Sequence, residues 1–311
     1  MNTSPPVGKF RLRFLWWLLA ALILVMVFLK VPLDDVIAAA GRGRLGRFAA
    51  VAVTFTLATY LLDSCVHLWL FRRFLPPVGA GTVFRARGES YLLLALGFVY
   101  GQGGMAYLMS RRTGKPVTET AGVLLFLMLN NLMAIIAFPT LALLLLAPDS
   151  GLRSSAEWRQ IPLWLAGTWV VCAAVVLFWA RDWKLPLRDR LKRGLGSTID
   201  RARPRDYAIV ISLRALQALS WCCFSWLGLG AFGVEIPLGS LLVLGPIVGL
   251  SAAIPTPGRL GTSQGAWLLL FGAHYDPARI LAFSLCWTVG VNLCRWLLGA
   301  AFVAASRLDS K

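Results

Sequence analysis

The chain has 311 residues, of which 58% are hydrophobic and 14% are charged, and its mean hydropathy is +0.70. This composition excludes an ordinary soluble domain and indicates an integral membrane protein. About 20 apolar residues are needed for each helical span, so the chain has room for roughly six to eight spans and little else. The net charge of +17 lies in the loops, where it suits anionic lipid headgroups, and no basic, aromatic-rich segment suggests nucleic-acid binding.

Six apolar runs are long enough to cross a bilayer as helices. They cover residues 14–31, 49–71, 120–147, 162–180, 207–232 and 280–305. The most basic loop, residues 181–205, is expected on the cytoplasmic side. Alternation of the spans then places both termini in the cytoplasm. We therefore expect an all-α polytopic protein of the cytoplasmic (inner) membrane, with the first run retained as an anchor.

Two further apolar segments are interrupted in their middles. Tyr91–Met109 breaks at Gly101–Gly104, and Leu238–Ala273 breaks at Pro255–Gly265. Lipid cannot satisfy free backbone N–H and C=O groups, so such breaks persist only where protein buries them or they line a polar cavity. We predict that both segments are re-entrant hairpins.

The two hairpins occupy matching places in the sequence. Each half, about residues 10–147 and 162–305, holds three spans and one hairpin in the same order. Because three is an odd number, the halves have opposite orientations, and residues 1–311 form one membrane domain with an inverted repeat. Broken segments at corresponding positions of two repeats predict a transport site near the bilayer midplane.

Polar residues inside the apolar segments supply the candidates for that site. Arg214 and Arg295 lie within predicted spans, and a buried guanidinium binds a phosphate or a carboxylate through its planar fork. The alternatives are therefore a lipid headgroup or an internal ion pair, for example with Asp63. The predicted substrate-binding residues are Arg259, Gln264, Gln102, Arg295, Arg214, Gly101, Gly103, Gly104, Pro255, Pro257, Gly258 and Gly261.

Arg259 lies at the predicted tip of the second hairpin, where a helix restarting near Thr262 would direct its positive end toward an anion. The alternative is that Thr262 or Ser263 only caps this helix. In the first hairpin, Gln102 is the one side chain able to bind a ligand, although its glycine neighbours are equally suited to close helix packing.

Metal and cofactor chemistry is not indicated. His67 and His274 are far apart in the sequence, and the six cysteines show no metal-binding spacing. The scattered carboxylates also argue against an enzyme, with a membrane-embedded lipid transferase kept as a minor alternative.

The region Leu244–Arg295, with its Pro- and Gly-rich turn, resembles the flippase-like membrane domain of the lysylphosphatidylglycerol synthase family. Tyr100–Arg112 resembles the family's other re-entrant region, and the resemblance covers about residues 10–305. The chain departs from the family at Arg259, where glycine is usual, and at Gln264, where glutamate is usual.

The resemblance implies lipid translocation or binding, because the soluble aminoacyl-transferase domain of the bifunctional members is absent from these residues. The first hypothesis is a flippase for an anionic or isoprenoid phospholipid. The alternative is a non-transporting accessory or scaffold protein of an envelope-lipid pathway. The expected partners are membrane lipids, with a second copy of the chain or a pathway protein as further possibilities.

Overall fold

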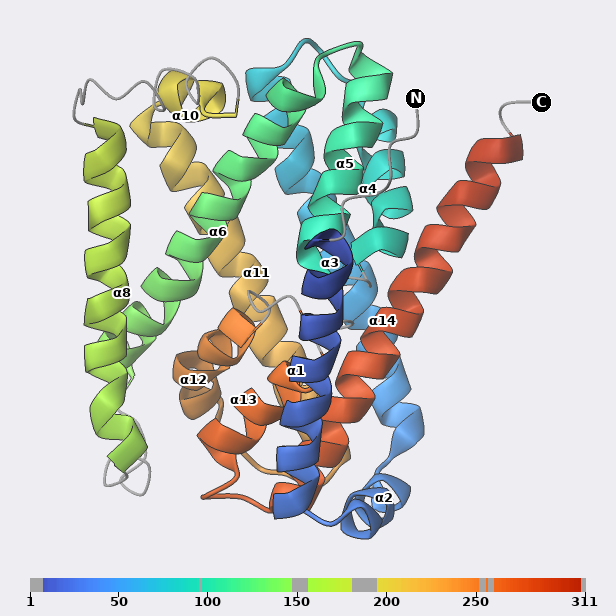
Figure 1. Cartoon of the computed structure of the whole chain (residues 1–311), viewed down its shortest axis with the longest axis vertical. Helices are drawn as coiled ribbons and strands as arrows, with labels where there is room; N and C mark the ends of the chain where they lie inside the picture. The colour runs from blue at the N-terminus through green and yellow to red at the C-terminus, as the bar shows by residue number, and fades with distance from the viewer. Residues whose placement is uncertain are drawn as a thin grey trace.

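The computed structural model describes residues 8–94, 97–146, 156–180, 195–251, 256 and 260–308. Within these residues every regular element is an α-helix, so the predicted fold class is confirmed as all-α. Most of the long helices run along the long axis of the molecule (Figure 1). Each helix satisfies its backbone N–H and C=O groups by hydrogen bonds within the same segment, as a lipid environment requires.

The first half of the chain forms three long helices, one short helix and one pair of intermediate length. In order they are α1 (Gly8–Lys30), α2 (Leu33–Arg42), α3 (Leu45–Phe74), α4 (Ala80–Leu94), α5 (Phe98–Thr113) and α6 (Val117–Leu145). Pro32 and Pro116 stand directly before α2 and α6, where a missing N–H breaks no helical hydrogen bond. Gly114 ends α5 with a left-handed φ of 67°.

The second half shows a similar succession of long and short helices. It comprises α8 (Ala156–Ala180), α10 (Ser197–Arg201), α11 (Pro204–Ala231), α12 (Leu238–Leu250), α13 (Thr262–Phe271) and α14 (Pro277–Leu308). The short helices α2 and α10 lie at opposite ends of the molecule (Figure 1).

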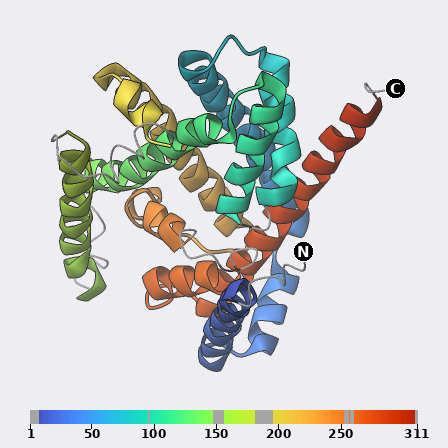
Figure 2. The same cartoon turned by 45° about the horizontal axis from the view of Figure 1, so that its top comes forward.

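Within the described ranges, four helices are long and apolar enough to cross a membrane: α3, α6, α11 and α14. They correspond to four of the six predicted spans. The other two predictions, residues 14–31 and 162–180, coincide with α1 and α8. Both of these helices lie at the edge of the molecule (Figure 2), where α1 packs on α13 and α8 on α6.

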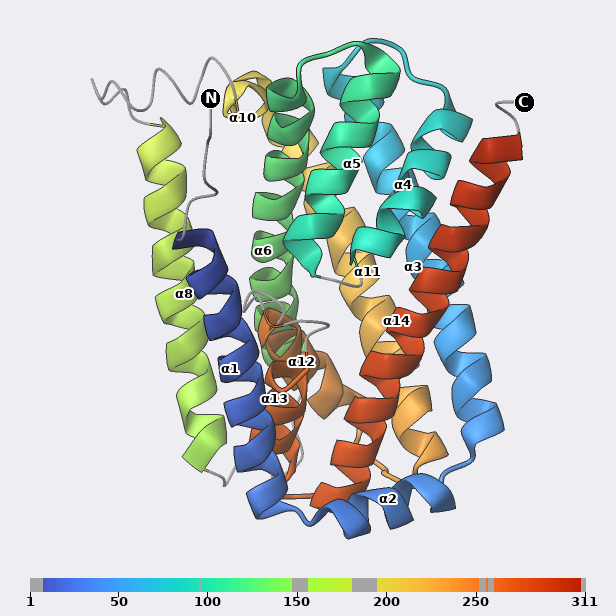
Figure 3. The same ribbon diagram turned by 45° about the vertical axis from the view of Figure 1, so that its right-hand side comes forward.

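Two pairs of shorter helices enter the molecule from opposite ends. The pair α4–α5 descends from one end and the pair α12–α13 rises from the other, and the inner ends of these helices lie near mid-height (Figure 3). We call these inner ends the tips of the two pairs.

The predicted position of the first break was wrong. Gly101–Gly104 lies inside the continuous helix α5, and the chain turns just before it, around Gly97. Gly101 and Gly104 are required for packing, because a Cβ on Gly101 would lie 2.8 Å from the Cα of Leu94 in α4 and one on Gly104 would lie 2.5 Å from Cδ1 of Leu93. Small residues allow two helix backbones to approach this closely, so the sequence signal marked the contact between α4 and α5 and not their turn.

The second break is placed closer to its prediction. Helix α12 ends at Leu250 and α13 begins at Thr262, so the helix restarts at the expected residue. Most of the intervening residues, 252–255 and 257–259, lie outside the described part of the chain.

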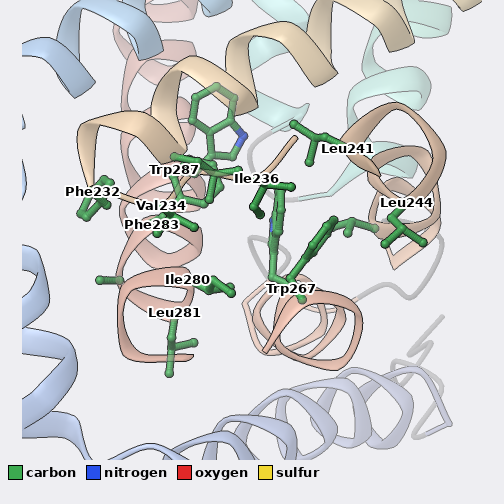
Figure 4. Packing of buried hydrophobic residues seen from close by; sticks show 14 of the residues in the cluster. Phe232, Val234, Ile236, Leu241, Leu244, Trp267, Ile280, Leu281, Phe283 and Trp287 are labelled. Carbon is green, nitrogen blue, oxygen red and sulfur yellow. The ribbon is translucent and has the colours of Figure 1, made fainter. Parts of the chain in front are cut away.

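Aromatic side chains anchor the second pair against its neighbours. Trp267 of α13 is 1% exposed. Its ring meets Phe283 of α14 edge-on at 5.2 Å between centroids and stacks on Trp221 of α11 at 5.9 Å. Figure 4 shows Trp267 and Phe283 among the apolar residues of this core. Each such ring pair contributes roughly 0.5–1.5 kcal/mol beyond burial, which holds α13 at a fixed depth.

Candidate functional site

A single buried carboxylate joins three helices. Asp63 of α3 accepts a hydrogen bond from Nη2 of Arg87 on α4 at 2.6 Å and another from Nη1 of Arg214 on α11 at 2.6 Å. All three residues are buried, with Asp63 5%, Arg87 1% and Arg214 6% exposed. Burial of this kind is tolerated only when charges are paired, so the carboxylate fixes the positions of both guanidiniums.

A third guanidinium lies next to this pair. The Cζ atom of Arg295, on α14, lies 5.9 Å from the centroid of the Tyr91 ring, and the Cζ atom of Arg87 lies 5.0 Å from the same ring. Among the described residues Arg295 forms no ion pair. We call Asp63, Arg87, Tyr91, Arg214 and Arg295 the charged cluster. It contains three positive charges and one negative charge, an excess that attracts anions.

Several polar atoms in and beside the charged cluster have unused hydrogen-bonding capacity. Within the described part of the chain, the Nε atoms of Arg87 and Arg214 have no hydrogen-bond partner. His67 donates from Nδ1 to the backbone carbonyl of Asp63 at 2.6 Å, and its Nε2 has no partner. Buried polar groups are normally satisfied, so these atoms indicate a place where a polar ligand or water belongs.

A pocket adjoins the charged cluster at Arg295. Its volume is about 50 Å³, and residues of α3, α11, α13 and α14 line it: Phe55, Trp221, Ser263, Trp287, Thr288, Val291, Asn292 and Arg295. The walls combine aromatic rings with hydroxyl, amide and guanidinium groups. This mixture is typical of a ligand site, in which a few polar groups fix orientation within an apolar lining.

The N-terminus of α13 reaches the same pocket through Ser263. Gly261 precedes the helix with a φ of 82°, and its added Cβ would lie 2.8 Å from the backbone oxygen of Ala20. Only glycine suits this combination of backbone angle and close approach. The first N–H groups of a helix lack partners within it and carry partial positive charge, so this end adds to the attraction for an anion.

Gln264 holds the tip of the second pair in place. Its Oε1 accepts the backbone N–H of Gly261 at 2.8 Å, and its Nε2 donates to the carbonyl of Ser284 at 3.3 Å and to Oγ1 of Thr288 at 3.2 Å. The side chain is 0% exposed. Both ends of the amide are therefore engaged by the protein, and Gln264 positions α13 against α14.

Gln102 occupies the comparable place near the start of α5, with a different environment. It is 4% exposed, and neither Oε1 nor Nε2 has a partner within the described residues. Gly101 and Gly104 pack against Leu94 and Leu93 of α4, whereas a Cβ on Gly103 would meet nothing within 4 Å. The amide of Gln102 is thus the unused polar group of this tip.

The structure therefore places Arg214 in the charged cluster, Arg295 in both the cluster and the pocket, and Gly261 and Gln264 at the tip beside them. The predicted site residues Arg259, Pro255, Pro257 and Gly258 lie outside the described residues. Arg87 and Tyr91 were missed, because the sequence around Arg87 was interpreted as a basic flank of the first hairpin. Their spacing of four residues, which puts both on one face of a helix, was the available signal.

The predicted ion pair was correct for one arginine and not for the other. Asp63 pairs with Arg214 and with the unpredicted Arg87, and it forms no ion pair with Arg295. No group of three His, Cys, Asp or Glu side chains gathers in the described ranges as a metal would require.

Comparison with known families identifies this architecture. Residues 10–299 match the model of the lysylphosphatidylglycerol synthase transmembrane region. The chain belongs to this family. A search of curated proteins found no match. The matched segment contains the charged cluster, the pocket and both helix pairs. Family membership and the long apolar helices together indicate an integral membrane protein with a role that involves membrane lipids.

Proposed function

We propose that this member of the lysylphosphatidylglycerol synthase transmembrane family binds an anionic or isoprenoid phospholipid and moves it between leaflets. The observation that carries the proposal is an excess of guanidinium groups, two buried and one half-buried, beside a polar pocket. Arg87 and Arg214 share one carboxylate, and Arg295 has none among the described residues. Charged groups within a membrane protein normally face its interior or a wet pathway and mark the route of a substrate.

In the proposed topology, six spans and two re-entrant helix pairs form an inverted repeat of residues 10–147 and 162–305 within one domain. The support comes from the similar order of long and short helices in the two halves and from the opposite directions in which the pairs enter. Both tips reach mid-height, where alternating access of two repeats around one site would expose a headgroup to either leaflet. The basic loops favour cytoplasmic termini in the inner membrane.

The proposed roles differ among the site residues. Arg295 contacts the headgroup from α14, and Arg214 contributes charge from α11 while paired to Asp63. Gln264 and Gly261 keep the α13 N-terminus in register, and the unpaired amide of Gln102 offers a contact from the first tip. Sequence grounds alone support the proposed headgroup contact of Arg259, which follows Pro255, Pro257 and Gly258 in the sequence.

The test is transbilayer movement of labelled phosphatidylglycerol in liposomes that contain the purified protein. We expect movement above that of empty liposomes, and a loss of about tenfold or more for Arg295→Ala, because a hydrogen bond to a charged group contributes roughly 1.5–3 kcal/mol. Arg279→Ala is the matched control, since Arg279 lies on the same helix and is exposed at its end.

Movement that both variants retain at the wild-type rate would place the site away from Arg295. Absence of movement for phosphatidylglycerol and for every other lipid tried would contradict the flippase proposal. The non-transporting accessory role would then be the better account of the helix pairs.

A further inference from the structure

The charge of the site restricts which phospholipid headgroup it accepts. In the described residues Asp63 is the one carboxylate that pairs with any arginine of the charged cluster. Glu89 and Asp206, two other largely buried carboxylates, pair with Arg112 and Arg73 elsewhere. Three guanidiniums and one carboxylate leave two positive charges without a counter-ion, and such an excess in a low-dielectric interior favours a ligand that supplies two negative charges.

Phospholipid headgroups differ in the charge that they supply. A phosphodiester carries one negative charge at neutral pH, whereas a phosphomonoester carries nearly two because its second pKa is about 6. An aminoacylated or zwitterionic headgroup adds an ammonium group, which needs a carboxylate. The carboxylate of Asp63 is already shared by the guanidiniums of Arg87 and Arg214, so its charge does not offset that of a further ammonium group.

The number of donors also suits a terminal phosphate. Arg295 lines the pocket, carries five N–H donors and has no ion pair among the described residues. The pocket adds Ser263, at the N-terminus of α13. Three terminal oxygens of a monoester use such a set more fully than the two free oxygens of a diester.

Resting on the proposed function, we infer that the substrate is a lipid with a terminal phosphomonoester, held by Arg295 beside the N-terminus of α13. Lipids whose phosphate is a diester bind more weakly at this site.

The experiment measures binding of dioleoyl phosphatidic acid, a monoester, and dioleoyl phosphatidylglycerol, a diester with the same acyl chains, to the full chain in nanodiscs. At about pH 8 we expect the monoester to bind at least tenfold more tightly, and at about pH 5, below its second pKa, we expect most of this preference to disappear. Arg295→Ala removes the preference, and Arg279→Ala preserves it.

The diester is the internal control for titration of the protein itself. The groups that face Arg295 and its neighbours are Asp63 and His67 on α3, Arg87 and Tyr91 on α4, and Arg214 on α11. Of these, histidine is the type whose ordinary pKa falls within the range tested. Its titration changes the binding of both lipids, whereas the second ionisation of the phosphate changes only that of the monoester.

Equal or tighter binding of the diester at about pH 8, or a preference that is the same at both pH values, overturns the inference. Parallel transport assays separate it from the proposed function. Equal movement of both lipids overturns the headgroup inference and leaves translocation intact. Selective binding of the monoester without movement supports the inference and contradicts translocation. Failure of both lipids to bind overturns both.

Discussion

The tips of the two helix pairs reach the same depth in the molecule but are held there by different forces. In the second pair, Gln264 has all its hydrogen bonds satisfied, and it fixes α13 to α14. In the first pair, the buried amide of Gln102 is unpaired within the described residues. That pair is instead fixed by charge, through Arg87 to Asp63 inside and through Glu89 to Arg112 and Ser306 farther out.

This difference shows that the tip of the second pair is preorganised, whereas the tip of the first pair has a polar side chain whose hydrogen-bonding groups are unused within the described residues. A hydrogen-bond network in which every donor and acceptor is paired rigidifies its surroundings. Buried polar groups without a partner indicate a place where a ligand or water binds. The second tip therefore forms a fixed wall of the pocket at Ser263. The first pair contributes the positive charge of Arg87 and the ring of Tyr91. The ring centroid lies 5.0 Å from the Cζ atom of Arg87 and 5.9 Å from that of Arg295.

The largest effect is expected where the charge that fixes the first pair is removed. Asp63→Asn leaves Arg87 and Arg214 buried without a counter-ion, and we expect the free energy of unfolding to fall by about 3–5 kcal/mol. Denaturant titration in mixed micelles measures the change. Arg279→Ala, which breaks a half-exposed pair with Asp276, should cost less than about 1 kcal/mol. Equal losses for the two variants would contradict the assigned role of Asp63.

The next effect compares the two glutamines directly. Gln264→Ala removes three hydrogen bonds, each with a net contribution of about 0.5–1.5 kcal/mol, so we expect a total loss of about 2–4 kcal/mol. Gln102→Leu removes no hydrogen bond within the described residues and replaces a polar amide by an apolar side chain of similar size, so lipid-free stability should stay equal or rise. The same denaturant titration measures both variants, and a comparable loss for Gln102→Leu would show that the first tip is as firmly bonded as the second.

A smaller effect on stability is expected for substitution of two glycines, Gly261, which the backbone geometry requires, and Gly103, whose position has room for a side chain. Gly261→Ala forces a φ of 82° on an L-residue and brings its Cβ to 2.8 Å from the Ala20 oxygen, which should lower stability by about 1–3 kcal/mol. Gly103→Ala lies inside α5 with nothing within 4 Å and should raise stability by about 0.5–1 kcal/mol through helix propensity. Thermal unfolding of the two variants in one detergent tests this opposite sign; a shift of both in the same direction would refute it.

Particular residues show how far sequence reasoning reached. The spans at α3, α6, α11 and α14 were predictable because a lipid environment imposes a length and an apolar composition on any helix that crosses it. The restart of α13 at Thr262 was predictable because glycine and proline end one helix and a small polar residue follows them. The family was also predicted, and the match over residues 10–299 confirms it.

Other features were inaccessible because their signal is ambiguous. Gly101 and Gly104 are compatible with either a turn or a close helix contact, and only the position of α4 decides for contact. Arg87 lies between other basic residues in the sequence, so its burial could not be distinguished from a cytoplasmic flank. Pairing across 151 positions, as between Asp63 and Arg214, leaves no periodicity in the chain.

By itself the sequence determined the environment of this protein, the length and order of its main helices, the family, and the presence of buried arginines in the spans. The environment and the helices follow from local composition, because a bilayer requires each spanning segment to be apolar, of sufficient length and internally hydrogen-bonded. The tertiary structure alone decided which arginines pair with Asp63, which arginine lines the pocket, and which glutamine forms the hydrogen bonds that position a helix. Those outcomes depend on the distances between helices far apart in the chain, and electrostatic and hydrogen-bonding energies depend on these distances.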